Sequence, residues 1–469
     1  MQSLWTVAEA VAATSGRPEG LSDGPISSVS IDSREIAPEA LFIAIKGDRL
    51  DGHDFVRAAL DAGASAAVVS AEWHAANGGG DRLIVVPDTL EALRGLARAA
   101  RARSRAIFVA VTGSAGKTTT KEAIRTVLQT AGTTHFSVKS FNNHWGVPLM
   151  LARMPREAQY GVFEIGMNHA GEITPLTRMV RPHIAVVTTV AAAHLEFFNS
   201  VTEIAEAKAE ILLGLEPGGI ALLNADHDYL HVLFAAARKL KIDRIVTYGF
   251  EETADWHIEK AETAGSRIFA RVTHGGESID LNLQVPGRHM VANAVAALAV
   301  ASLCGAALTP ATGALARFGA PEGRGMTLRL GREPKPLLLV DESYNANVAS
   351  MNAAMDVFAN LAPPGGSKVL VLGDMLEMGP QGEELHRSLR DAALRTGATR
   401  IFLVGKAMES LASSLGEAYV TAHGARVEDV ANDVLSSLAY GDAVMVKGSK
   451  GVRLGLLVDL IRERFKQAA

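Results

Sequence analysis

The sequence FVAVTGSAGKTTTK, at residues 108–121, organises the middle of the chain. An apolar, β-branched run ends abruptly at Thr112, and a loop with two glycines leads into a helical pattern that continues to Leu128. This order of strand, glycine loop and helix is typical of a phosphate-binding loop (P-loop), in which backbone N–H groups and the helix N-terminus point at a phosphate. The stretch therefore predicts a bound nucleoside triphosphate.

The residue types of this loop support the prediction. Lys117 adds a point charge, and the Thr118 hydroxyl can hold Mg²⁺. The strict motif has a glycine five residues before Gly116, where this chain has Val111, so the loop is a variant. The alternative is a glycine-rich turn that happens to precede a lysine. The predicted nucleotide contacts are Gly113, Ser114, Ala115, Gly116, Lys117, Thr118 and Thr119.

Composition limits the class of protein. The 469 residues are 48% hydrophobic and 21% charged, as in a soluble globular protein, and their number predicts roughly three domains. A net charge of −5 argues against a protein that coats nucleic acid or lies on a membrane surface. The single cysteine excludes an intramolecular disulfide and fits a reducing compartment, so we expect a cytoplasmic protein.

One uncharged run, at residues 291–308, is long enough to raise the question of a membrane span. It is dominated by alanine and contains Asn293 and Ser302, so we predict a helix buried in a protein core. Residues 1–13 lack a basic start and carry Glu9 in their only apolar stretch, which is unlike a signal peptide. We expect neither membrane insertion nor a nucleic-acid partner.

Alternating strand and helix patterns predict three α/β domains, at residues 1–104, 105–319 and 320–469. The first is small, the second carries the P-loop on a parallel sheet, and the third is doubly wound without a second P-loop. Strands are predicted at 41–45, 160–165, 184–190, 219–223, 337–340, 368–372, 400–404 and 443–446, and strand-like residues at 256–284. Helices are predicted at 55–62, 173–180, 201–213, 351–361, 383–393, 427–438 and 453–465.

Polar residues gather where the predicted strands of the second domain end. Glu164 ends one strand, and His194 and Asn224 follow two others. Because ligands of an open α/β sheet bind at the carboxyl ends of its strands, these residues should converge on the P-loop. Glu164 and Thr118 offer oxygen ligands for Mg²⁺, and His194 a less usual imidazole. Taken singly, each is more often a cap or a surface group.

Other polar positions are less informative by themselves. Arg34 and Lys46 follow two strands of the first domain and suit a diphosphate, although scattered surface charges near turns explain them as well. Lys208 has the pattern of a solvated helix charge. Polar, glycine-rich loops at 341–347, 373–379 and 447–451 look like the other half of an interdomain cleft.

The motifs, in their order along the chain, resemble the Mur ligases of bacterial cell-wall synthesis. They are TGSAGKTTT at 112–120, SFNNHWGVP at 140–148, EIGM at 164–167, His194, AKAE at 207–210 and GRH at 287–289. Two further runs, DESYNAN at 341–347 and GDMLEMG at 373–379, resemble the member that adds D-alanyl-D-alanine. The resemblance covers essentially the whole chain.

This resemblance implies an ATP-dependent ligase of the EC 6.3.2 type in peptidoglycan synthesis, with Mg²⁺. It would join D-alanyl-D-alanine to UDP-N-acetylmuramoyl-tripeptide (UDP-MurNAc-tripeptide) through an acyl phosphate, giving the pentapeptide, ADP and phosphate. The implied domains are an N-terminal UDP-MurNAc domain, a central P-loop ATPase and a C-terminal Rossmann-like domain that closes over the site. We expect a monomer.

Carried over position by position, the resemblance assigns Lys117, Lys208 and His194 to catalysis. Lys208 matches a lysine that is carbamylated in several members of the family. This match replaces the interpretation of Lys208 as a solvated charge. The implied metal ligands are Thr118, Glu164, His194 and Lys208. The implied nucleotide contacts beyond the P-loop are Asn142, Asn143, Asn293, Arg324 and Asp341. The implied substrate contacts are Ser30, Asp32, Ser33, Arg34, Lys46, Gly47, Asp51, His53, Asn345 and Asn347.

Two departures from the family pattern affect these assignments. Met290 stands where the family usually has asparagine, so Asn293 acts without a second amide. Lys450 stands where the family has arginine, and lysine cannot copy a bidentate arginine contact.

Three alternatives are weighed against this assignment. The related ligase that adds the third peptide residue would carry an Asp-Asn-Pro-Arg-type motif, which is absent. A P-loop kinase would transfer phosphate to a stable acceptor, and the large third domain argues against it. A binding module would not consume ATP when substrates are present. The third residue of the tripeptide, diaminopimelate or lysine, is left open.

We expect Lys117→Ala to abolish ATP-dependent turnover while the fold stays intact, because the phosphates lose their positive point charge. ADP release measures turnover, and circular dichroism checks the fold. Unchanged turnover in a folded variant would remove the P-loop from the mechanism.

Overall fold

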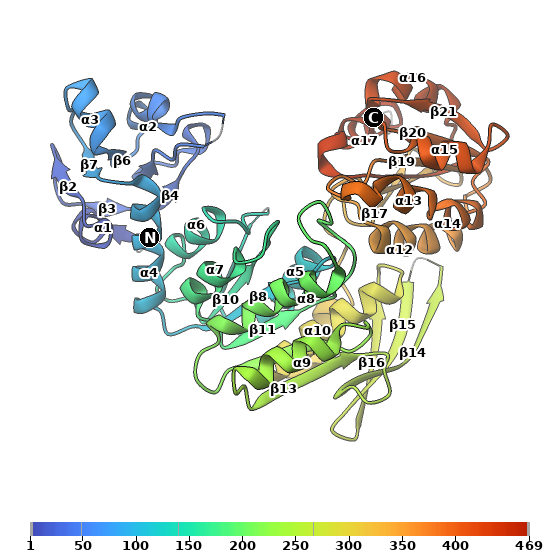
Figure 1. Ribbon diagram of the computed structural model, residues 1–469, viewed down its shortest axis with the longest axis horizontal. Helices are drawn as coiled ribbons and strands as arrows, with labels where there is room; N and C mark the ends of the chain where they lie inside the picture. The colour runs from blue at the N-terminus through green and yellow to red at the C-terminus, as the bar shows by residue number, and fades with distance from the viewer. Residues whose placement is uncertain (1–2, 48, 139, 266, 467–469) are drawn as a thin grey trace.

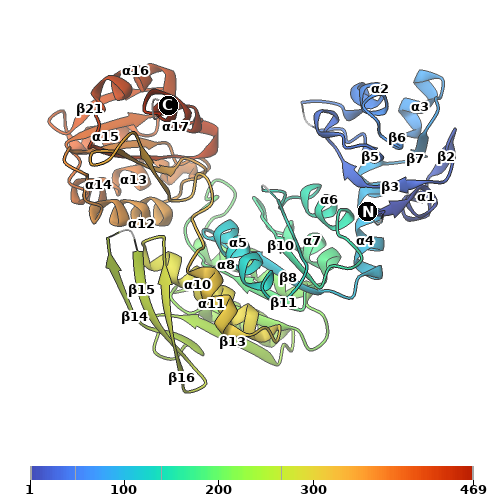
Figure 2. The same ribbon diagram turned by 180° about the vertical axis from the view of Figure 1, so that it is seen from behind.

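Three lobes, each built on a large β-sheet, make up the computed structural model, which describes residues 3–47, 49–138, 140–265 and 267–466. The N-terminal and C-terminal lobes stand on either side of the central lobe (Figure 1), and Figure 2 shows the same arrangement from behind. The predicted three-domain α/β architecture is confirmed. The domain boundaries at 104 and 319 stay predictions.

The N-terminal lobe is a five-stranded sheet in the order β2-β7-β6-β5-β4, parallel except for β2. Strands β5, β6 and β7 are almost continuously apolar because both faces of the sheet are covered. A two-stranded β1-β3 ribbon adjoins it. The elements are β1 (Trp5–Thr6), α1 (Val7–Thr14), β2 (Arg17–Glu19), β3 (Pro25–Ile26), β4 (Ser28–Ser30), β5 (Ala40–Ile43), α2 (Val56–Asp61), β6 (Ala66–Ser70), α3 (Ala71–Asn77), β7 (Leu83–Val86) and α4 (Thr89–Arg103).

The central lobe is a nine-stranded sheet in the order β16-β15-β14-β13-β12-β11-β8-β10-β9. Strands β8 to β14 run parallel to one another, and β15 and β16 extend the sheet as antiparallel strands beyond β14. The first elements are β8 (Ile107–Thr112), α5 (Lys117–Leu128), β9 (Thr134–Phe136), α6 (Gly146–Ala152), β10 (Tyr160–Glu164), α7 (Ile173–Val180), β11 (Ile184–Val187) and α8 (Val201–Ala209). The others are β12 (Ile220–Asn224), α9 (Leu230–Lys239), β13 (Arg244–Gly249), β14 (Trp256–Ala264), β15 (Arg267–His274), β16 (Glu277–Leu283), α10 (Arg288–Leu303) and α11 (Leu308–Leu315).

The C-terminal lobe is a six-stranded sheet in the order β17-β18-β22-β19-β20-β21, parallel except for β17. Helices lie on both of its faces (Figure 1). The elements are β17 (Met326–Leu330), β18 (Leu337–Glu342), α12 (Val348–Ala359), β19 (Lys368–Gly373), α13 (Gly382–Arg387), α14 (Arg390–Arg395), β20 (Arg400–Val404), α15 (Glu409–Leu415), β21 (Val420–Gly424), α16 (Val427–Ser437), β22 (Ala443–Lys447) and α17 (Gly455–Arg464).

The uncharged run at 291–308 is a core helix, as predicted. It forms most of α10, and every residue from 290 to 301 is buried. In the described part of the chain no helix is long and apolar enough to cross a membrane.

Two predicted helices differ in the structure. The helix expected at 201–213 ends at Ala209 and continues as a 3₁₀ turn, in which the Glu210 carboxylate accepts hydrogen bonds from Gly171 and Thr174 at the start of α7. The helix expected at 383–393 is divided into α13 and α14. The spacing of apolar residues does not predict such breaks, because they depend on tertiary contacts or on local hydrogen bonds.

The N-terminal and central lobes share one hydrophobic core. A continuous cluster of buried apolar side chains runs from the N-terminal sheet through α4 to one face of the central sheet. The C-terminal sheet has separate clusters on its two faces. The first two lobes are therefore joined by apolar packing.

Arg101 on α4 fixes this junction. Its guanidinium donates to the carbonyls of Val180 and Arg181 at the C-terminus of α7, at 2.7 and 2.8 Å. It also forms an ion pair with Glu216 at 2.8 Å. Cations are favoured at a helix C-terminus, where the last carbonyls lack partners.

We expect Arg101→Ala to lower the free energy of unfolding by about 3 kcal/mol, because it removes a buried cation that satisfies three acceptors. The matched control is Arg98→Ala on the same helix, whose side chain is 58% exposed. That change should stay within about 0.5 kcal/mol. Urea denaturation of the full chain measures both, and equal effects would contradict a structural role for Arg101.

Candidate active site

A cavity of about 750 Å³ lies between the central and C-terminal lobes. Its central wall is the P-loop, the ends of β10, β11 and β12, and the start of α10. Its other wall is the loops that follow β18, β19 and β22. The carboxyl ends of strands from two parallel sheets thus face one another, as ligand sites in α/β folds require.

The P-loop has the backbone geometry that its glycines allow. Gly113 has φ +153°, and a Cβ atom there would lie 1.9 Å from the Thr188 hydroxyl. Gly116 has φ +80° and immediately precedes α5. The Lys117 ammonium donates to the Gly113 carbonyl at 2.7 Å. Burial lowers the pKa of Lys117, Glu164 opposes that shift, and Arg324 adds to it.

The residues at the start of α5 and the end of β10 form an oxygen-rich site. The Thr118 hydroxyl donates to one Glu164 carboxylate oxygen at 2.7 Å, and the Asn142 amide donates to the other at 2.8 Å. Glu164 is only 1% exposed. A buried carboxylate beside a hydroxyl oxygen is the donor set that Mg²⁺ prefers, so these residues fit a magnesium ion.

Lys208 is buried, so the interpretation of its pattern as a solvated charge is wrong. Its side chain on α8 is 2% exposed and forms no hydrogen bond or ion pair within the described residues. Burial first, and then the charge of Lys117, lower its pKa well below the usual value. A lysine side chain, as amine or as ammonium, is a poor Mg²⁺ ligand, so Lys208 would fit the metal only after conversion to an anion.

His194 lies in the loop after β11, with a left-handed backbone at φ +57°. Its Nδ1 is 2.5 Å from a carboxylate oxygen of Glu377 in the C-terminal lobe. This hydrogen bond is the main cause of the lowered pKa of Glu377. His194 faces the cavity, as predicted, but the structure adds a carboxylate partner that the sequence analysis did not assign to it.

Polar contacts join the P-loop side of the cavity to the C-terminal lobe. The Asn347 amide donates to the Ser114 carbonyl at 3.3 Å, and the hydroxyls of Ser140 and Tyr344 form a hydrogen bond. The Tyr344 ring lies beneath two cations, with the Arg324 guanidinium 4.3 Å and the Lys450 ammonium 5.3 Å from its centroid. The predicted Arg324, Asn345 and Asn347 do reach the cavity.

The cavity extends along the start of α10. Asn293 accepts a hydrogen bond from the Thr120 hydroxyl at 3.0 Å and borders the P-loop, and Met290 lines the wall beside it. The Arg288 guanidinium stacks on the Phe250 ring, 3.6 Å from its centroid. Asp226, Phe250 and Arg288 line the cavity and were not predicted as site residues, although their positions after β12, β13 and at the start of α10 pointed there.

Several predicted site residues support the cavity wall from behind. Asn143 accepts from the Gly146 N–H at 2.9 Å. The Asp341 carboxylate is 2% exposed and accepts from the Gly323 and Ser343 N–H groups, both at 3.1 Å. These side chains position loops, and both oxygens of the Asp341 carboxylate are already engaged.

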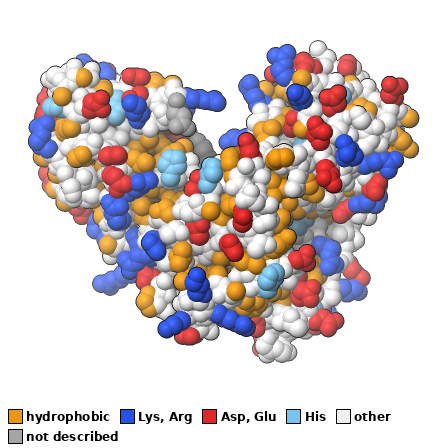
Figure 3. Space-filling model, in the orientation of Figure 1, with side chains coloured by type: hydrophobic (Ala, Val, Ile, Leu, Met, Phe, Trp, Pro, Cys, Tyr) orange, Lys and Arg blue, Asp and Glu red, His pale blue; other side chains and the backbone are white. Residues whose placement is uncertain are grey.

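The eight predicted substrate residues of the N-terminal lobe do not line this cavity. Asp32 and Arg34 form a bidentate pair at 2.8 and 2.6 Å. The His53 ring is buried and has both nitrogens engaged, with Nδ1 2.6 Å from Asp51 and Nε2 accepting from the Ser70 N–H at 3.0 Å. Figure 3 shows the surface hollowed between this lobe and the C-terminal lobe.

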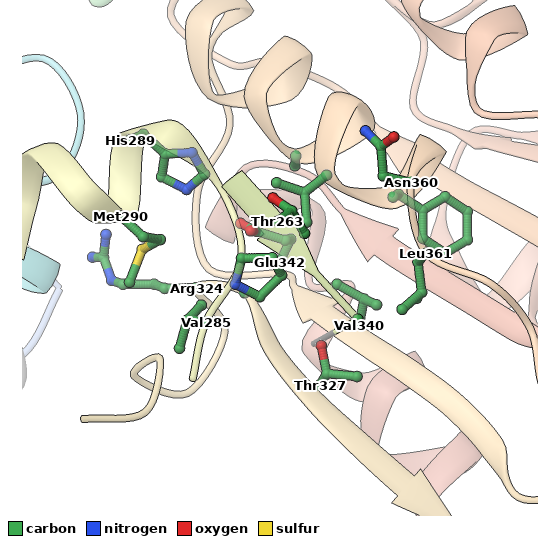
Figure 4. Close-up of a pocket in the computed structure, with 16 residues that line it drawn as sticks. Thr263, Val285, His289, Met290, Arg324, Thr327, Val340, Glu342, Asn360 and Leu361 are labelled. Carbon is green, nitrogen blue, oxygen red and sulfur yellow. The ribbon is translucent and has the colours of Figure 1, made fainter. Parts of the chain in front are cut away.

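A second, small cavity marks the seam between the lobes. Figure 4 shows its lining, which includes Val285 and His289 from the central lobe and Thr327, Glu342 and Asn360 from the C-terminal lobe. Its volume of about 30 Å³ is enough for an ordered water rather than a substrate.

The chain matches three family descriptions. They are the Mur ligase middle domain over residues 111–301, the Mur ligase glutamate ligase domain over 328–450 and the Mur ligase family catalytic domain over 25–101. It is 36% identical to UDP-N-acetylmuramoyl-tripeptide--D-alanyl-D-alanine ligase of Escherichia coli, covering 94% of this chain and 95% of that protein. It is 33% identical to the ligase of the same name from Bacillus subtilis, covering 98% of each.

Solved structures agree with this similarity. A crystal structure of MurF from Acinetobacter baumannii superposes with a TM-score of 0.83 at 29% identity, covering 98% of this chain and 99% of that one. MurF from Thermotoga maritima in complex with ADP gives a TM-score of 0.77 at 25% identity, covering 93% and 97%.

We expect Lys208→Met to raise the thermal unfolding temperature at neutral pH. The pKa of Lys208 is lower in the folded protein, so the unfolded chain binds more protons. Lys208 therefore destabilises the fold at pH values below its unfolded pKa of about 10.4. The stability gained by Lys208→Met should shrink as pH rises toward that value. The matched control is exposed Lys239→Met, which should change little. A less stable Lys208→Met protein would contradict the lowered pKa of Lys208.

Proposed function

The chain belongs to the Mur ligase family, and from this premise we propose that it joins D-alanyl-D-alanine to UDP-MurNAc-tripeptide, using ATP. The products would be UDP-MurNAc-pentapeptide, ADP and phosphate. The observation that carries the proposal is the cavity in which the P-loop faces the loops of the C-terminal lobe, in a chain similar to such ligases over almost its whole length.

The first step would activate the tripeptide. A carboxylate oxygen attacks the γ-phosphorus of ATP, an O–P bond forms, and the bond to the ADP oxygen breaks. Two anions must approach, so positive charge at the P-loop is needed. Lys117 and Arg324 both line the cavity and would offset this repulsion.

Magnesium is part of the proposal. Thr118 and Glu164 would hold one ion, and His194 with Lys208 a second. When bound, Mg²⁺ would withdraw charge from the phosphate oxygens. Lys208 would serve as a carbamate: its neutral amine attacks carbon dioxide, an N–C bond forms, and the nitrogen loses a proton to solvent. The lowered pKa of Lys208 supports this, because only an unprotonated amine is nucleophilic.

The second step would form the amide. The neutral amine of D-alanyl-D-alanine attacks the acyl carbon and a C–N bond forms. The bond from that carbon to the phosphate oxygen then breaks, inorganic phosphate leaves, and the nitrogen loses a proton to solvent. We assign the incoming dipeptide to the C-terminal side of the cavity, where Asn345 and Lys450 lie. Lys450 has no ion pair within the described residues, so its ammonium is available for a carboxylate.

The N-terminal lobe would hold the UDP-sugar. Arg34 is 86% exposed at the side chain, Lys46 and Gly47 are exposed, and the side chains of Asp51 and His53 form a hydrogen bond close by in the chain. We therefore give His53 a positioning role within this segment of the chain. We also propose that the enzyme is monomeric and that it acts in the cytoplasm, a reducing compartment that its one unpaired cysteine fits.

The test combines purified protein with ATP, Mg²⁺ and UDP-MurNAc-tripeptide, with or without D-alanyl-D-alanine. We expect release of ADP and phosphate that needs both substrates, and a product with the mass of UDP-MurNAc-pentapeptide. Both forms of the tripeptide, ending in diaminopimelate or lysine, are tried. A folded protein that binds ATP but turns over neither form would overturn the proposal.

A further inference from the structure

The contact between His194 and Glu377 joins two lobes at the edge of the cavity. Both side chains line the cavity, and the carboxylate oxygen lies 2.5 Å from Nδ1. The Glu196 N–H also donates to the Glu377 carbonyl at 3.1 Å. A side-chain bond and a backbone bond therefore hold the same two loops together.

The loop that carries Glu377 is anchored within its own lobe. The Leu376 N–H donates to the Ser449 hydroxyl at 2.9 Å, and the Met375 N–H to the buried His386 ring at 2.9 Å. Glu377 itself has a left-handed backbone at φ +62°. Non-glycine residues adopt this conformation rarely, so the surrounding loop imposes it and aims the carboxylate across the seam.

Gly379 lets the two lobes approach this closely. It has φ +62°, and a Cβ atom there would lie 2.9 Å from the Leu195 carbonyl oxygen. A larger residue would push the loop away from the segment that carries His194. The approach of the two loops is thus built into the backbone on both sides.

The bond also determines which nitrogen of His194 is free. In the neutral imidazole with Nδ1 donating to the carboxylate, Nε2 carries the lone pair, and it has no hydrogen-bond partner among the residues that the structure describes. Carboxylates that bind the second nitrogen of a metal-ligating imidazole orient the ring and make it a stronger ligand. The Glu377 carboxylate oxygen lies 2.5 Å from Nδ1 of His194, where this role requires it.

We propose that Glu377 is a positioning residue through which docking of the C-terminal lobe prepares His194 to bind a metal ion. This rests on the proposed function, in which His194 is a ligand of the second Mg²⁺. Because coupling between two equilibria is reciprocal, metal at His194 also favours the docked arrangement of the lobes. The metal site is then complete only when both lobes face the nucleotide.

The test measures the affinity of the full chain for Mn²⁺ by electron paramagnetic resonance, with a non-hydrolysable ATP analogue and bicarbonate present. Glu377→Ala should weaken the second Mn²⁺ about 10-fold, the effect usual for such partners. Glu377→Gln should lie closer to the wild type, because the amide oxygen still accepts from Nδ1. The matched control is Glu383→Ala, an exposed carboxylate nearby on α13.

A double-mutant cycle with His194→Ala completes the test. His194→Ala should weaken the second Mn²⁺ by itself, and adding Glu377→Ala should cause no further loss. If His194→Ala leaves Mn²⁺ binding unchanged, the proposed metal role of His194 fails and this inference with it. If His194→Ala weakens binding but Glu377→Ala does not, or if Glu377→Gln is as weak as Glu377→Ala, the inference alone is overturned.

Discussion

Two lysine side chains held away from water, at the carboxyl end of the central sheet, are the constraint on which the site depends. Among the residues that the structure describes, partly buried Lys117 donates to the Gly113 carbonyl alone, and Lys208 is buried without a partner. Burial lowers the pKa of both lysines, because a charged ammonium is disfavoured away from water. Such an arrangement is costly unless anions arrive, and the phosphates and carboxylates of the proposed reaction are such anions.

The three lobes are joined in two different ways, and this matches the chemistry proposed for them. The N-terminal and central lobes share apolar packing along α4, with Arg101 bound to the end of α7. The C-terminal lobe meets the P-loop side of the cavity through polar contacts, including those of Asn347, Tyr344 and Glu377. Hydrogen bonds between two lobes can be replaced by hydrogen bonds to water when the lobes separate. Separating a shared apolar core has a large free-energy cost, because it exposes apolar surface to water.

Much of the fold followed from local pattern. Buried parallel strands such as Val109 to Val111 and Val369 to Leu372 are continuous apolar runs, and the P-loop glycines are required by backbone geometry alone. The antiparallel extension of β15 and β16 was predicted only as strand-like residues, because pairing partners are not encoded in a single segment. The divided helix at 382–395 was missed for a similar reason, since its apolar residues continue across the break.

The sequence by itself determined the P-loop, the three α/β units and the family resemblance, because these depend on short motifs and on regular spacing. Only the tertiary structure decided that Lys208 is buried, since an alanine-rich helix face gives no sign of which side meets the core. It also decided that Asp341 and Asn143 brace loops, and that Glu377 reaches His194. These facts depend on which segments meet in space, and burial and hydrogen-bond partners come from residues far apart in the chain.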